Sequence, residues 1–119
     1  MDDNLFYGGK MMKISKDLST GTIPTMILSV LKSEDMYGYK IIKALEIRSE
    51  NVFCLKEGTL YPILHSLEKE NVLESYWDNS GSRRKKYYHI TKKGLKMLAD
   101  KTEEFEEFTV TVRKVLHFA

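Results

Sequence analysis

The 119-residue chain has too few cysteines for the disulfides that stabilise small secreted proteins, and it has no apolar run long enough to cross a membrane. It has a single cysteine, Cys54, which excludes an intrachain disulfide and a cysteine-based zinc cluster. No stretch approaches the roughly 20 apolar residues of a membrane helix, and the acidic start has no apolar run of signal-peptide length. These absences predict a cytoplasmic protein without membrane contact. Cys54 has apolar neighbours and is expected to be a small core residue.

The sequence also lacks the motifs of common catalytic sites. His65, His89 and His117 form no HExxH pair and have no acidic partner at metal-ligand spacing. There is neither a GxSxG nucleophile elbow nor a phosphate-binding GxxxxGK[ST] loop. The carboxylate-rich run over 103–107 spreads its charges around a helix axis. The chain is therefore expected not to be an enzyme and to have no catalytic residue, cofactor or metal.

Negative charge is missing from one segment. Between Ser80 and Lys96 the chain has seven Lys or Arg and no Asp or Glu, which leaves 12 cations against 17 anions elsewhere. Four of the seven are consecutive and follow a turn-rich stretch: Arg83, Arg84, Lys85 and Lys86. Because adjacent like charges repel, this cluster is either a solvated hairpin tip or a binding site for a polyanion such as DNA. Successive strand side chains alternate, so two of the four are expected to reach a phosphate.

Apolar periodicity predicts a single domain of the α+β class, mainly helical, with one hairpin. In chain order the expected elements are a loose leader (1–12), a short helix (14–17), helices over 22–33 and 36–49, a short strand (52–55), a helix (58–70), a hairpin with strands over 72–78 and 85–91, and a helix from 92. This is the order of a winged helix-turn-helix domain, here expected over 13–91. In that fold the third main helix enters the DNA major groove, and the hairpin flanks it as a wing.

The third helix of the expected domain is the candidate recognition helix. Its apolar stripe consists of Leu60, Leu67 and either Ile63 or Leu64, and Asn71 is expected to end it in the left-handed conformation. The opposite face then exposes side chains that can contact bases or phosphates: Thr59, Tyr61, His65, Ser66 and Lys69. A tyrosine at position 61 can alternatively pack in the core.

The second helix offers a further candidate contact with DNA. Its apolar stripe is expected at Tyr37, Ile41, Ala44 and Leu45. Tyr37 and Tyr39 flank Gly38 at the helix start, where the N-terminus itself attracts phosphate. One of these two tyrosines is expected to be in the core.

Two of these stretches resemble a known family. MYGYKIIKAL and GTLYPILHSLEKENVLESYWDNSGSRRKKYYHITKKG resemble, in order and spacing, motifs of the PadR-type transcriptional regulators, and the resemblance covers roughly residues 18–98. It implies a winged-helix repressor that dimerises through its C-terminal helix and is relieved by a small molecule or stress. The single helix after Gly94 resembles the compact subgroup, whose members are similar to multidrug-sensing repressors. An acidic residue is common in the family where this chain has Lys40, which is a further candidate DNA contact.

The C-terminal segment, 92–119, has an apolar face of its own. Its members follow the alternating three- and four-residue spacing of a coiled coil: Leu95, Leu98, Thr102, Phe105, Thr109, Val112 and Leu116. Leu95 and Leu98 are expected to pack on their own domain. The rest of the face is too long for one small domain to cover, which predicts a homodimer. Phe105 and Phe108 either fill the dimer seam or, with their mates across the axis, form a slot for a planar aromatic or cationic effector.

Two functions remain open from the sequence. The leading hypothesis is a dimeric, sequence-specific repressor of transcription that binds a double-stranded DNA operator. The alternative is a winged-helix module for protein–protein interaction, whose basic wing binds an acidic partner surface. The two differ in salt dependence, because binding to many phosphates weakens steeply as salt rises and depends on DNA sequence.

Overall fold

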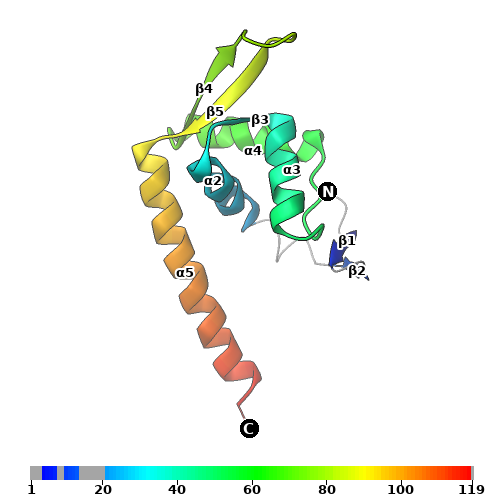
Figure 1. The fold of residues 1–119 in the computed structure, drawn as a ribbon. Coiled ribbons are helices and arrows are strands. Elements are labelled where there is room, and N and C mark those ends of the chain that lie inside the picture. The colour runs from blue at the N-terminus through cyan, green and yellow to red at the C-terminus, as the bar shows by residue number, and fades with distance from the viewer. Residues whose placement is uncertain (1–3, 8–9, 14–20, 119) are drawn as a thin grey trace.

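The computed structural model describes residues 4–7, 10–13 and 21–118, and Figure 1 shows its elements. Near the N-terminus, β1 (Asn4–Tyr7) pairs antiparallel with β2 (Lys10–Lys13). The segment expected to be a loose leader therefore contains paired strands, which were not predicted. The short helix expected over 14–17 lies outside the described residues.

Three helices form the body of the domain: α2 (Ile23–Ser33), α3 (Gly38–Arg48) and α4 (Glu57–Lys69). All three lie close to the predicted positions. Pro24 is in the first turn of α2, where its missing N–H costs no helical hydrogen bond. Ile27 of α2 and Ile41 of α3 are completely buried, as expected for the inward faces of packed helices.

The predicted apolar stripe of α4 is confirmed, and of the two alternatives Leu64 is buried whereas Ile63 is only half-buried. Leu60 and Leu67 lie on the same face and are at most 4% exposed. Asn71 takes the predicted left-handed conformation, with φ of 62°. This conformation ends the helix and directs the chain into the sheet that follows.

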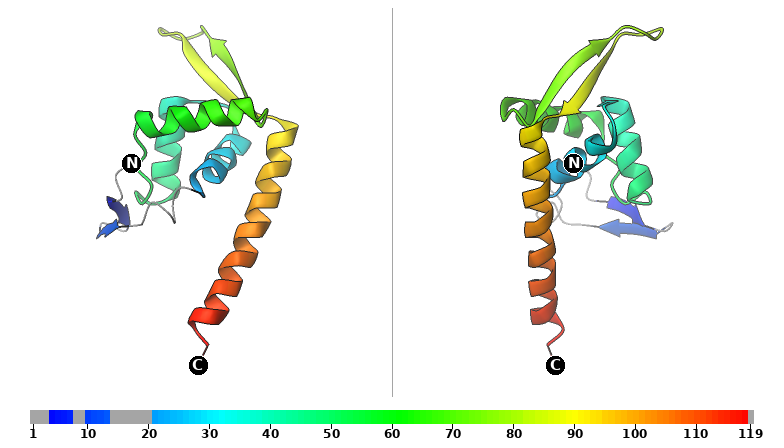
Figure 2. Two further views of the ribbon diagram at one scale, coloured as in Figure 1. Left: turned by 180° about the vertical axis from the view of Figure 1, so that it is seen from behind. Right: turned by 60° about the vertical axis from the view of Figure 1, so that its left-hand side comes forward.

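A three-stranded antiparallel sheet in the order β3–β5–β4 lies beside the helices. β4 (Leu73–Asp78) and β5 (Lys85–Ile90) form the predicted hairpin, the wing, which projects from the helical body in Figures 1 and 2. β3 (Met36–Tyr37) pairs with Tyr87 and Tyr88 of β5. Tyr88 is 1% exposed, so the base of the wing is part of the core.

The strand predicted at 52–55 is wrong, because these residues form a bend and an irregular segment while β3 completes the sheet. The apolar run there has a different cause: Val52 and Leu55 pack inward from a loop and are 7% and 6% exposed. Cys54 between them is exposed, so the expected core cysteine is also wrong. The loop begins with Glu50 and Asn51, both left-handed, which turn the chain sharply after α3.

The long helix α5 (Lys92–Leu116) begins at a cap that also holds the end of α4. The Thr91 hydroxyl accepts a hydrogen bond from the Gly94 backbone N–H (3.1 Å) and donates one to the Asn71 carbonyl (2.8 Å). A Cβ at Gly94 would collide with the Val72 carbonyl, so only glycine fits there. Leu98 is 7% exposed in the core, and beyond it α5 extends away from the body (Figure 2).

Candidate nucleic-acid interface

One side of α4 is left uncovered by the helical body. As predicted, His65, Ser66 and Lys69 are exposed on it, and Thr59 is half-buried at the helix start. These side chains offer an imidazole, two hydroxyls and an ammonium group, all of which can hydrogen-bond to base edges or phosphates. The uncovered face of α4 can therefore contact a nucleic-acid groove.

Tyr61 does not point outward as the helical pattern predicted. It is half-buried and packs against the core, and its hydroxyl lies beside Gly38 at the start of α3. A Cβ at residue 38 would lie 2.9 Å from Tyr61 Cζ, closer than real contacts allow. Tyr61 is on the flank of α4, about 100° around the axis from Leu60, so it faces α3 rather than solvent. Its contact with DNA stays a prediction.

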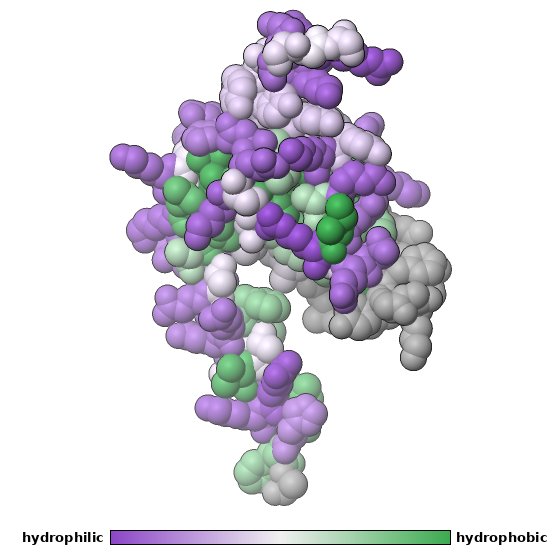
Figure 3. All heavy atoms as spheres, in the orientation of Figure 1, coloured by the Kyte–Doolittle hydropathy of each residue, from purple (hydrophilic) through white to green (hydrophobic). Residues whose placement is uncertain are grey.

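The first two cations of the wing lie in the loop that precedes β5. Arg83 is exposed and makes no ion pair, hydrogen bond or ring contact with its side chain in the described part of the chain. The Arg84 guanidinium lies 4.1 Å from the centre of the Trp77 ring, a cation–π contact across the hairpin. Figure 3 shows hydrophilic residues over this end of the molecule.

The next two cations point to opposite faces of the sheet, as strand alternation predicted. The Lys85 ammonium lies 4.3 Å from the centre of the Tyr37 ring on the outer face. Lys86 is on the face that covers α4, and its ammonium lies 3.9 Å from a carboxylate oxygen of Glu68. The four consecutive cations therefore have four different surroundings.

A carboxylate of the helical body holds both strands of the wing. Asp35, in the turn before β3, accepts a hydrogen bond from the Tyr76 hydroxyl of β4 (2.7 Å) and pairs with His89 Nδ1 of β5 (2.8 Å). Partial burial tends to raise the pKa of Asp35, but the bonds from Tyr76 and His89 outweigh it and hold that pKa below its ordinary value. The bond to Asp35 raises the pKa of Tyr76 to about 12. The wing is thus tied to the body outside the core.

Aromatic rings line the outer face of the sheet. Tyr87 stacks on Tyr76 of the neighbouring strand at 5.8 Å and meets Tyr37 edge-on at 5.5 Å, both measured between ring centres. Tyr37 was predicted to belong to the buried stripe of the second helix, but it ends β3 and is only half-buried. Tyr39 is 54% exposed, so the expectation that one of Tyr37 and Tyr39 lies in the core is wrong.

Lys40, the further candidate DNA contact, lies in the first turn of α3 and is already paired. Its ammonium is 2.7 Å from a carboxylate oxygen of Glu34. The hydrogen bond and the charge of Glu34 raise the pKa of Lys40 above its ordinary value. Both groups are about half exposed, so the pair is open to exchange with other ions.

The apolar face of α5 divides into a covered and an uncovered part. Leu98 belongs to the core of its own chain, as expected, whereas Leu95 is 40% exposed and does not pack as predicted. Val112 is half-buried. Phe105 is 53% and Leu116 is 71% exposed, and apolar side chains on α5 are visible in Figure 3. An uncovered face of this kind is typical of a surface that meets another chain.

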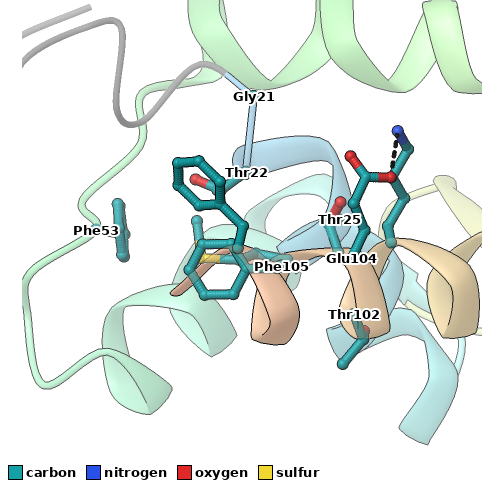
Figure 4. Close-up of a pocket in the computed structure, with 10 residues that line it drawn as sticks. Gly21, Thr22, Thr25, Phe53, Thr102, Glu104 and Phe105 are labelled. Carbon is teal, nitrogen blue, oxygen red and sulfur yellow. Dashed lines mark ion pairs between the residues drawn. The ribbon is translucent and has the colours of Figure 1, made fainter. Parts of the chain in front are cut away.

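A cavity of about 450 Å³ opens between α5, the start of α2 and the loop after α3. Figure 4 shows Phe53 of the loop on one side and Phe105 of α5 on the other. Phe108 also contributes, and Lys101 and Glu104 form an ion pair of 3.6 Å in the lining. Both phenylalanines of the predicted effector site therefore line one cavity, and the third ring in its lining, Phe53, was not predicted.

Other residues of the interface were not predicted, because their roles depend on contacts with residues of other elements. Asp35 was not predicted because its partner Tyr76 lies 41 positions later, and Glu68 was not predicted because it meets Lys86 of another strand. Trp77 could have been found, since the hairpin register places it opposite Lys86, close to the cationic run.

Among residues 4–7, 10–13 and 21–118, no three His, Cys, Asp or Glu side chains gather where they could hold a metal. No helix in these residues is long and apolar enough to cross a membrane.

The helix order, the uncovered face of α4 and the cationic wing define a winged-helix DNA-binding protein. The family model described as "Transcriptional regulator PadR-like family" matches residues 27–100, more than half of the chain. The chain belongs to this family of transcriptional regulators, as its motifs indicated, and such proteins bind DNA and are not enzymes.

Two solved structures and one further protein sequence resemble this chain over most of its length. A transcriptional regulator from Clostridium thermocellum is 36% identical, with a TM-score of 0.78 over 83% of this chain and 97% of that one. A PadR family regulator from Eggerthella lenta is 34% identical, with a TM-score of 0.78 over 87% of this chain and 88% of that one. An uncharacterized protein of Lysinibacillus sphaericus is 36% identical over 79% of this chain and 87% of its own length.

Proposed function

We propose that this protein is a dimeric repressor that binds a two-fold symmetric DNA operator and leaves it when a planar aromatic or cationic molecule binds. The observation that carries the proposal is the position of the cationic wing beside the uncovered face of α4. In a winged-helix complex the recognition helix lies in the major groove, and the wing runs along the neighbouring phosphates. The segment from 80 to 96, which includes the wing cations, has no acidic residue, whereas the rest of the chain has more anions than cations.

The contacts with DNA fall into two classes. Thr59, His65 and Lys69 of α4 face the groove and read bases or position the helix, whereas the Tyr61 hydroxyl lies beside Gly38 and could reach DNA only if its ring moved away from α3. The wing cations, Arg83 to Lys86, bind phosphates, and Arg83 is the freest of them. Tyr37, Tyr39 and Lys40, at the start of α3, lie where the helix N-terminus adds a favourable potential for a further phosphate.

The uncovered face of α5 supports a dimer. Phe105, Val112 and Leu116 lie on it, with Leu95 at its start, and a second copy of the helix would cover them. Leu98 is excluded from this contact, because its own core buries it. A fixed dimer sets the two recognition helices about 34 Å apart, the distance between successive major grooves on one side of DNA.

The cavity beside α5 supports release by a ligand. Its volume falls within the range of drug-sized sites, roughly 300–1,000 Å³. Three phenylalanine rings suit a flat aromatic molecule, and Glu104 in the lining favours a cationic one. A ligand that separates α5 from α2 would change the angle of the dimerisation helix and hence the spacing of the recognition helices. Only such a state-dependent affinity can shift the DNA-binding equilibrium.

The test is binding to duplexes that carry the inverted repeats upstream of the gene, measured against scrambled duplexes at several salt concentrations. A protein with about six to ten phosphate contacts should lose roughly 10³–10⁵ in affinity between about 50 and 200 mM salt. Arg83→Ala should weaken binding to all duplexes and reduce the salt slope by about 0.9, whereas Lys114→Ala, on the far part of α5, should not. Binding that ignores both sequence and salt would favour a protein-interaction module instead.

A further inference from the structure

Glu68 is an acidic residue within the cationic surface of the wing. It lies in the last turn of α4, with a side chain 26% exposed. One carboxylate oxygen accepts a hydrogen bond from the Ser75 hydroxyl of β4 at 2.9 Å. The other lies 3.9 Å from the ammonium of Lys86 on β5. The carboxylate is therefore fixed between both strands of the wing and points at one of its cations.

Lys86 is the one wing cation whose side chain lies within 4 Å of a carboxylate oxygen in the described residues. Arg84 and Lys85 lie over neutral aromatic rings, Lys85 is opposite Asp78 on β4 without a close ion pair to it, and Arg83 has no side-chain partner in the described residues. Lys86 also lies 5.7 Å from the centre of the Tyr88 ring, but its nearest charged group is a carboxylate. A carboxylate offers an ammonium group the same kind of anionic oxygen as a DNA phosphate does.

The Glu68 carboxylate and a DNA phosphate would compete for the ammonium group of Lys86. The Lys86 side chain is 34% exposed, and an ion pair that water reaches has little net stability, so a phosphate can replace Glu68. The replaced carboxylate cannot retreat, because its bond to Ser75 holds it at the surface. It then lies well within the Debye length of about 8–10 Å from the bound phosphate and repels it.

We propose that Glu68 is an internal competitor for the phosphate that Lys86 binds, and that it weakens attachment to every duplex irrespective of sequence. The inference rests on the proposed function, since it concerns the same surface of the wing and α4. Its effect is to limit the amount of protein held by non-operator DNA. The operator is then selected by base contacts of α4, while the wing supplies fewer sequence-independent contacts than its four cations suggest.

The test compares Glu68→Gln with Glu70→Gln on a random duplex and on the operator duplex. Glutamine keeps the size of the side chain and can still accept from Ser75, but it removes the charge. Glu70 is the matched control, because it lies two residues further along the chain, is exposed and has no ion pair in the described residues. We expect Glu68→Gln to tighten binding to both duplexes about fivefold and Glu70→Gln to change it by less than about twofold.

The same comparison in a Lys86→Met background shows whether the effect passes through Lys86. There, Glu68→Gln should no longer tighten binding. The proposal is overturned if both glutamate variants tighten binding equally, if neither does, or if Glu68→Gln is just as effective without Lys86.

Elution from heparin, a sulfated polyanion, separates this inference from the proposed function. Glu68→Gln should elute at higher salt than the wild type and Glu70→Gln, and only when Lys86 is present. If the wild type binds no duplex, the proposed function fails, and the order of elution still decides whether Glu68 masks Lys86 from anions.

Discussion

The Tyr76 hydroxyl donates a 2.7 Å hydrogen bond to Asp35, a residue 41 positions earlier in the chain. This bond joins the edge strand of the wing to the turn that follows α2. Because Asp35 also pairs with His89 on β5, one carboxylate determines how both strands sit on the body. This connection adds to the buried Tyr88 and the β3–β5 pairing, which also hold the wing on the body.

Replacing Asp35 by Ala should therefore loosen the wing. We expect the free energy of unfolding to fall by about 1 kcal/mol, a value reduced for the partial exposure of the site, and the wing amides to exchange faster with solvent. The contribution of Asp35 is present above about pH 4 and is lost as the pH falls through its lowered folded pKa. Asp100→Ala breaks an exposed pair with Lys96 and is the control, with a change within about 0.5 kcal/mol. Equal losses in both variants would contradict a special role for Asp35.

The same hydrogen bond has a signature at high pH. The pKa of Tyr76 is raised to about 12 by its bond to Asp35, and burial raises that of Tyr88 to about 12. When folding raises the pKa of a phenol, the protonated phenol stabilises the folded state. This stability is fully present below about pH 10, the ordinary pKa of tyrosine, and is lost as the pH rises through about 12. Ultraviolet titration should show late-ionising tyrosines, and Tyr76→Phe should remove one of them. If the late phase is unchanged in that variant, the bond to Asp35 does not persist in solution.

Gly38→Ala should be destabilising, because the new Cβ would force the end of the half-buried Tyr61 ring to move. Overpacking of this kind costs about 1–3 kcal/mol, measured by chemical or thermal unfolding. Gly58→Ala is the matched control: no atom lies within 4 Å of its added Cβ, so it should gain about 0.5 kcal/mol from helix propensity. Adding Tyr61→Leu to Gly38→Ala should restore part of the loss. Failure of this rescue would mean that residue 38 is restricted by something other than Tyr61.

Truncation after Ala99 should separate folding from dimerisation. The shortened chain keeps Leu98 in the core but loses Phe105, Val112 and Leu116. Sedimentation should then give monomers with a folded circular dichroism spectrum, and binding to a two-fold operator should be lost. A truncated protein that still sediments as a dimer would show that the interface lies elsewhere.

The cavity beside α5 should bind planar cationic dyes. Phe105→Ala and Phe53→Ala should each weaken dye binding about tenfold, because each removes a large apolar ring from the lining. Val115→Ala is the control, because this residue is 73% exposed on α5 and lies outside the cavity. If Phe53→Ala binds dye as well as the wild type, the dye occupies a slot across the dimer axis rather than this cavity. Fluorescence titration of the dye, followed by operator release, measures both steps.

The parts of the fold predicted correctly are those with a local signal. Leu60 and Leu67 repeat at helical spacing, Asn71 favours the left-handed conformation, and the hairpin strands flank a loop rich in turn residues. The third strand was missed because Met36 and Tyr37 give too short a run to show alternation, and their partners on β5 lie some fifty residues away. A strand of this kind is defined by its neighbour and not by its own sequence.

In the candidate site, too, features that depend on neighbouring residues were predicted, and features that depend on distant residues were not. The alternation of Lys85 and Lys86 between two faces follows from strand geometry alone, and the register confirms it. The position of Tyr61 depends on how closely α3 approaches α4, and no periodicity encodes that approach. Phe53 gave no signal as a cavity residue, since its partner on α5 is some fifty positions later.

The stack of Arg84 on Trp77 has an optical consequence. Trp77 is the only tryptophan in the chain, so excitation at the red edge of the aromatic band reports on the wing alone. Its ring is 51% exposed and lies against a guanidinium group that a phosphate would attract. Arrival of a duplex should shift the emission without any attached dye, while events at the far end of α5 leave it unchanged. The native chain therefore carries its own spectroscopic probe at the wing.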